Sequence, residues 1–198
     1  ILANRLRELA YLNSGLTISI EDQRSGTEET FCFEHGIREF VEHLNQGKAP
    51  LHSRPVYFKR DAPEQRLILE VALQYTDATT ESMYAFANTI HTIDGGAHLT
   101  GLRAAVTRSV NDHARQQSLL KDGDPNFSGE DTREGLTAIV SVKLTEPQFE
   151  SQTKVKLLNA EVRFHVENAV GEAFGQWLDE NPRDARAIVE KCLTAARA

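Results

Sequence analysis

The sequence has little of several features that mark specialised protein classes. It contains only two cysteines, Cys32 and Cys192, far apart and with no Cys-x-x-Cys pair, which argues against a disulfide framework and against a cysteine-based zinc site. No apolar run approaches the ~20 residues that a transmembrane helix needs, and the N-terminus lacks a signal-peptide layout. We therefore predict a cytoplasmic protein without membrane contact, in which both thiols are buried and free.

Positive charge is also scarce. The chain has 22 Lys and Arg against 29 Asp and Glu, a formal net charge of -7, which argues against a general basic coat for nucleic acid. Any contact with DNA must then be local. The seven histidines form no His-Glu-x-x-His array, and we predict no metal ligands in this chain. The first residue is Ile1, inside a helical pattern, so we expect a piece of a longer protein.

Apolar spacing predicts an α+β fold. Apolar residues three and four apart predict helices over residues 1–13, 36–46, 97–120, 157–181 and 182–198. Alternation predicts a hairpin over residues 16–33 and strands over 56–59, 67–75, 83–88 and 136–144, the last buried on both faces. These elements favour one mostly antiparallel sheet with helices packed against it. Asp94-Gly95-Gly96 is interpreted as a plain turn into a helix, since no P-loop pattern accompanies it.

The polar link Glu146–Lys154 lies between a predicted strand and a predicted helix. Pro147 keeps it out of regular structure, and Gln152 and Lys154, two residues apart, can point at one anionic group. A Lys offers a point charge with three donors, and a Gln amide adds a directed donor. A phosphate clamp is the functional interpretation, and an ordinary solvated loop is the alternative.

Two arginines of the helix 97–120 are candidates for a local contact with DNA. Arg108 lies almost opposite the apolar stripe, and Arg103 lies at its border. For Arg108 the alternative is an i,i+4 pair with Asp112 on a solvated face.

Five blocks, in order along the chain, resemble the transducer region of the ATPase subunit of bacterial type IIA topoisomerases, namely DNA gyrase B and its topoisomerase IV counterpart. The blocks are Arg5–Gly15, Asp94–Leu99, Arg103–Arg108, Arg133–Lys143 and Ser151–Lys154. The resemblance implies a left-handed βαβ transducer fold, like that of domain two of a small-subunit ribosomal protein. It also implies an ATP-hydrolysing DNA topoisomerase, an isomerase that couples ATP binding and hydrolysis to strand passage and negative supercoiling.

In this family Gln152 and Lys154 would reach the ATP γ-phosphate, and Arg103 would face the cavity through which DNA passes. ATP and Mg²⁺ are the implied cofactors. The residues for Mg²⁺ chelation, water activation and adenine recognition would lie in an ATP-binding domain of the GHKL class, outside this chain. The chain alone is then expected to be inactive.

The resemblance also implies boundaries and partners. Residues 1–15 would be the last helix of the GHKL domain, residues 16–180 the transducer, and residues 181–198 a helix leading toward the DNA-cleaving TOPRIM region. The partners would be the chain's own GHKL domain, a second copy of gyrase B, two copies of gyrase A and double-stranded DNA near the nucleoid. Open alternatives are the ATPase subunit of topoisomerase IV, the middle domain of a mismatch-repair or chaperone GHKL ATPase, and a pure interaction module.

Overall fold

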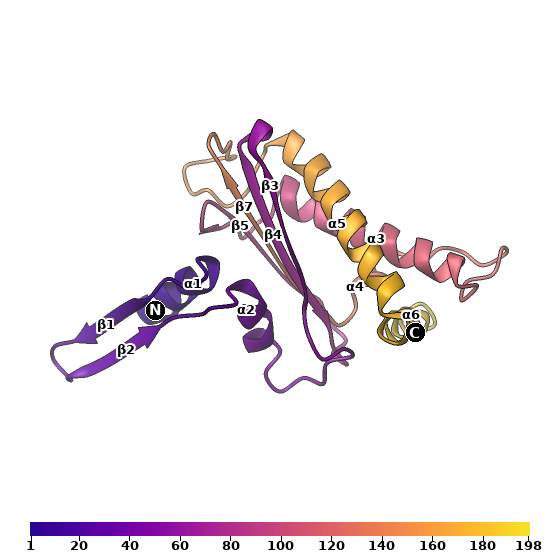
Figure 1. Ribbon diagram of the computed structural model, residues 1–198, viewed down its shortest axis with the longest axis horizontal. Coiled ribbons are helices and arrows are strands. Elements are labelled where there is room, and N and C mark those ends of the chain that lie inside the picture. Colours follow the sequence, from indigo (N-terminus) through magenta and orange to yellow (C-terminus); the bar gives the residue numbers. More distant parts are fainter.

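The computed structural model describes residues 1–198 and contains two sheets and six α-helices (Figure 1). The helices are α1 (Leu2–Leu12), α2 (Ile37–Leu44), α3 (Ala97–Gln116), α4 (Gly129–Arg133), α5 (Ala160–Glu180) and α6 (Pro182–Ala195). The strands are β1 (Ile18–Asp22), β2 (Thr27–Phe31), β3 (Val56–Ala62), β4 (Leu67–Tyr75), β5 (Ser82–Ala87), β6 (Ile90–His91) and β7 (Leu136–Leu144), with a 3₁₀ turn over Pro63–Gln65. The α+β class is confirmed.

The larger sheet has five strands in the order β3-β4-β7-β5-β6. Strand β7 lies at its centre, antiparallel to β4 and parallel to β5. This position explains why residues 136–142 of β7 are all buried, as the sequence predicts. The expectation of a single sheet is wrong, because β1 and β2 pair only with each other in a second sheet.

Helices cover both faces of the five-stranded sheet (Figure 1). On one face, the alternate β4 residues Leu69, Val71 and Leu73 join the main core of 30 buried residues, to which α3, α5 and α6 contribute. On the other face, Ala72 of β4 and Ile139 of β7 pack with α1 and α2 in a smaller cluster. The period of two along β4 therefore divides its side chains between two cores.

The β1–β2 hairpin extends away from the large sheet beside α1 (Figure 1). An isolated two-stranded hairpin is marginally stable at best, and its connection to the body is aromatic. The Tyr11 ring of α1 stacks on Phe33 at 3.7 Å and on Phe40 of α2 at 4.7 Å between ring centroids. The boundary that the sequence places after residue 15 stays a prediction.

Several details differ from the sequence analysis, which did not expect the short elements α4 and β6. Cys32 is exposed rather than buried, because it follows β2 where the hairpin joins the body; both thiols are free, and Cys192 is buried. Helix α3 ends at Gln116 rather than near residue 120, because Ser118 adopts a left-handed φ of 56°. Helix α5 begins at Ala160 rather than near Leu157, because Leu157 is held in extended backbone pairing.

None of the helices combines the length and the apolar character that crossing a membrane requires. No three His, Cys, Asp or Glu side chains gather in an arrangement that could hold a metal ion.

Candidate functional site

The link between β7 and α5 folds into a short two-stranded loop rather than an open coil. Phe149 pairs with Leu157 in an antiparallel bridge. The backbone N–H of Leu158 donates to Gln148 O at 2.8 Å, and that of Glu150 donates to Lys156 O at 3.1 Å. These bonds bring the two ends of the loop together and leave residues 151–154 as its exposed tip.

Gln152 and Lys154 both lie on this tip. The backbone N–H of Lys154 donates to Ser151 O at 3.0 Å, and the hydroxyls of Ser151 and Thr153 are 2.6 Å apart. Lys154 has a φ of 55°, in the left-handed region that few non-glycine residues occupy. The chain therefore turns sharply at the tip and presents two polar side chains within three residues.

The Lys154 ammonium makes no ion pair, whereas Lys156 nearby pairs with Glu150 at 3.7 Å. Its Nζ lies 5.8 Å from the centroid of the Phe149 ring. Such a contact at an exposed site contributes only about 0.5–1 kcal/mol. The cation is thus held loosely and has all three donors available for an anion.

Arg103 and Arg108 lie along α3, and each meets a carboxylate. Arg103 Nη2 lies 3.0 Å from Glu81 Oε1, and Arg133 Nε contacts the other oxygen of Glu81 at 2.8 Å. Arg108 Nη2 lies 3.4 Å from Glu167 Oε2 of α5. The alternative of an ion pair between Arg108 and Asp112 is therefore wrong. Arg108 instead pairs with a carboxylate of the neighbouring helix α5. Both guanidinium groups remain partly exposed, with DNA contact still a prediction.

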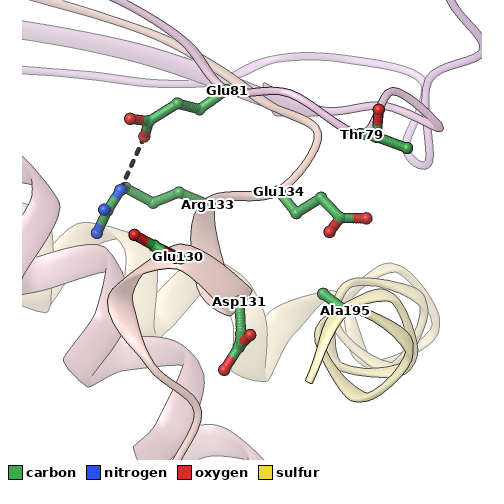
Figure 2. A pocket seen from close by; sticks show the side chains of 7 residues that line it. All are labelled: Thr79, Glu81, Glu130, Asp131, Arg133, Glu134 and Ala195. Atoms are coloured by element: carbon green, nitrogen blue, oxygen red, sulfur yellow. Dashed lines mark hydrogen bonds and ion pairs between the residues drawn. The ribbon is translucent and has the colours of Figure 1, made fainter. Parts of the chain in front are cut away.

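Of the surface hollows large enough to hold a ligand, two lie beside Arg103 or its ion-pair partner Glu81. Figure 2 shows the first, of about 430 Å³, where Glu130, Asp131 and Glu134 line the space and Arg133 points to Glu81. Its excess of carboxylates opposes an anion such as a nucleotide. The second, of about 330 Å³, lies at the base of the loop and carries three basic side chains, Arg103, Lys156 and Arg163.

Three residues near the base of the loop were given no functional role by the sequence analysis, although Gly96 and His98 lie in the block Asp94–Leu99. Asn159 is buried, and its Oδ1 accepts from Gln148 N–H at 2.7 Å. Gly96 pairs with Leu157. His98 is fully buried behind them, and burial lowers its pKa to about 4. Apart from that block, the signals were a glycine pair before a helix and polar residues at apolar spacing, and both patterns are common in segments that bind nothing.

Comparison with known proteins gives one family over most of the chain. Residues 36–198 match the DNA gyrase B family. The chain is 52% identical over 198 residues to the DNA gyrase B protein of Haloferax lucentense, a match that covers 100% of this chain and 31% of that protein. The chain spans less than half the length of the curated relatives it matches.

Solved structures agree with this match. The ATPase domain of Thermus thermophilus gyrase B, solved with an aminocoumarin, superposes with a TM-score of 0.88 at 38% identity, over 98% of this chain and 52% of that one. The ATP-binding domain of Francisella tularensis topoisomerase IV, solved with a small-molecule inhibitor, gives a TM-score of 0.83 at 28% identity, over 99% of this chain and 52% of that one.

Proposed function

The chain belongs to the DNA gyrase B family, and from that premise we propose that it is the transducer part of the ATPase subunit of a type IIA DNA topoisomerase. In this role it senses the γ-phosphate of ATP through Gln152 and Lys154 and couples ATP binding and hydrolysis to DNA strand passage and negative supercoiling. The match to the DNA gyrase B family and the 52% identity to a curated gyrase B protein support gyrase over topoisomerase IV.

The observation that carries this proposal is the loop tip. Lys154 makes no ion pair, and neither its side chain nor that of Gln152 is used in a hydrogen bond within the chain, although both lie on a sharply turned, exposed tip. Because these donors bind nothing within the chain, we infer that they bind a group held by another domain. A terminal phosphate accepts from both an ammonium and an amide.

The chemistry of this chain is electrostatic. ATP and Mg²⁺, held by the GHKL domain, supply the phosphoryl group and the metal charge. Lys154 adds a positive charge beside the terminal phosphate, which stabilises negative charge where it develops on hydrolysis. Gln152 orients the same group through a directed N–H. Because neither donor meets the other phosphates in this proposal, the contact distinguishes ATP from ADP.

Loss of the γ-phosphate removes the target of both side chains. The loop then loses its hold on the ATP-binding domain, and the transducer is free to change its orientation. Switching by contacts to a γ-phosphate, followed by rigid-body rotation, is a recurring mode of conformational change. In the assembled enzyme this rotation acts on gyrase A, on a second copy of gyrase B and on double-stranded DNA, with Arg103 and Arg108 as candidates for facing the DNA.

The domain organisation follows from the same proposal. Residues 1–15 end the GHKL domain, residues 16–180 form the transducer with the left-handed βαβ fold, and residues 181–198 lead toward the TOPRIM region. The parallel pairing of β5 with β7, with α3 between them in sequence, supports a βαβ unit.

The experiment that tests the proposal measures ATP hydrolysis by the full-length gyrase B protein. We expect Lys154→Ala to lose roughly 100-fold in kcat, because one charged donor to the transition state is removed. Gln152→Ala, which removes a neutral donor, should lose about tenfold. Lys121→Ala is the matched control, since Lys121 is also an exposed loop cation without an ion pair. Turnover of Lys154→Ala equal to that of Lys121→Ala refutes the clamp.

A further inference from the structure

We propose that Gly96 and Leu157 form a latch that positions the phosphate-sensing loop by joining its base to the start of α3. The latch is the backbone pairing between residues 94–97 and residues 155–157. This inference rests on the proposed function of Gln152 and Lys154, and it names the residues through which a contact at the tip acts on the body of the chain. It assigns Gly96 a positioning role.

Three hydrogen bonds build the latch. The N–H of Asp94 donates to Val155 O at 2.9 Å, that of Leu157 donates to Gly95 O at 3.1 Å, and that of Ala97 donates to Leu157 O at 3.0 Å. The last bond uses an N–H of the first turn of α3, which has no partner within the helix. Gly96 and Leu157 form a parallel bridge at the centre. The segment that leaves the loop is therefore tied to the helix before α5 begins.

Only glycine fits at position 96. Its φ of 130° and ψ of -163° belong to a region that residues with a side chain rarely adopt. A Cβ at this position would lie 2.3 Å from Leu157 O and 2.5 Å from Leu157 N. Both are backbone atoms and cannot rotate away. Any side chain here must force residues 94–97 and 155–157 apart.

The other side of the loop is fastened by Asn159. Its Oδ1 accepts from Gln148 N–H at 2.7 Å, and its Nδ2 donates to Glu146 O at 3.3 Å. Leu157, two residues earlier, has its side chain in the main core and is 1% exposed. Both ends of the loop are thus fixed to the same point of the body.

The start of α3 is in turn fixed to the sheet and to α5. His98 Nε2 donates to Thr92 Oγ1 at 3.0 Å, since the Thr92 hydroxyl proton is donated to Ala85 O of β5 at 2.9 Å. Further along α3, a Cβ on Gly101 would lie 2.7 Å from Arg163 O of α5, so the two helices touch through their backbones. A displacement that reaches the latch therefore reaches β5, α3 and α5 together.

Lys154 lies three residues before Leu157. With the latch closed, a displacement of the loop tip moves α3 and α5 together as one rigid body. With the latch opened, residues 155–159 can bend and absorb the same movement. Opening it should uncouple ATP hydrolysis from work on DNA while leaving nucleotide binding in the other domain intact.

The test uses full-length gyrase B in complex with gyrase A and compares Gly96→Ala with Gly47→Ala. Gly47 has a φ of 83°, and a Cβ added there would meet nothing within 4 Å, so it reproduces the left-handed strain without a latch. For Gly96→Ala we expect at least a tenfold fall in DNA supercoils introduced per ATP hydrolysed, with the KM for ATP within twofold of the control. A ratio for Gly96→Ala equal to that for Gly47→Ala overturns the latch.

Ala97→Pro provides a second variant, should Gly96→Ala not fold. Proline is favoured at the first position of a helix, and here it removes the N–H donated to Leu157 O and places its ring Cδ against that oxygen, so the bond cannot form. We expect the same fall in coupling, together with faster hydrogen exchange of the Leu157 and Asp94 amides with ADP or a non-hydrolysable ATP analogue bound. Exchange and coupling equal to wild type in Ala97→Pro overturn the latch.

Lys154→Ala in the same assays separates this inference from the function on which it rests. If Lys154→Ala keeps wild-type turnover, the clamp fails and the latch has no signal to transmit. If Lys154→Ala loses turnover but both latch variants couple normally, the clamp stands and the latch alone is wrong.

Discussion

The free energy of unfolding should depend on pH through His98, which lies in the first turn of α3, two residues after Gly96. Its side chain is fully buried, and its Nδ1 has no hydrogen-bond partner. Burial lowers the pKa of His98 from 6.5 to about 4, because a charged imidazolium would lose its hydration. The perturbation is a change from pH 7 to pH 5, compared between the wild type and His98→Gln, whose amide can still donate to Thr92 but does not titrate.

The sign follows from the lowered pKa. The unfolded chain binds a proton below about 6.5, whereas the folded chain resists it until about pH 4, so stability is lost as the pH falls through this window. The whole gap, at about 1.4 kcal/mol per pH unit, amounts to about 3 kcal/mol. Between pH 7 and pH 5 the loss should be about 2 kcal/mol.

Urea unfolding followed by circular dichroism measures this loss. With a slope of about 2 kcal/mol per molar urea, the midpoint of the wild type should fall by about 1 M more between pH 7 and pH 5 than that of His98→Gln. His52, whose pKa is also lowered by burial, is present in both proteins and cancels in the comparison. Parallel pH dependence in the two proteins would refute the reasoning that burial keeps His98 neutral.

Two further predictions concern packing and reactivity. Phe174→Ala should destabilise the chain by about 3–5 kcal/mol, because Phe174 is fully buried in the main core, whereas Phe164→Ala on an exposed part of the same helix should stay within about 0.5 kcal/mol; thermal melts of equal midpoint would contradict this. Cys32 should react with a thiol reagent in the native protein and Cys192 only on unfolding, since Cys192 is buried and burial raises its pKa to about 12. Mass spectrometry of the labelled chain checks the difference, and early labelling of Cys192 would contradict it.

Helices and strands whose buried residues recur at regular spacing could be predicted from the sequence. The alternation along β4 and the continuous apolar run of β7 carry a strong signal, because each position repeats the same environment. The order of the strands could not be predicted in this way. That β7 pairs in parallel with β5 and antiparallel with β4 depends on how α3 and α5 cover the sheet, which no local pattern records.

The tip of the candidate site could be predicted, but its base could not. Two donors two residues apart after Pro147 are visible in the sequence, since their spacing alone brings them to one turn. Leu157 has the spacing of the helix that follows, and periodicity therefore assigns it to α5. In the structure its N–H and C=O are taken by Gly95 and Ala97, a long-range pairing that outweighs the local preference.

The contrast between tip and base indicates where the loop can bend. Residues 151–154 are exposed and make few contacts, whereas Leu157 and Asn159 are buried and hydrogen-bonded. Local opening free energy rises with burial and hydrogen bonding, so flexibility should end within a few residues of Lys154. Because Gly101 brings α3 against the backbone of α5 at Arg163, α5 cannot swing alone without losing that contact. A movement that starts at the loop should therefore carry both helices.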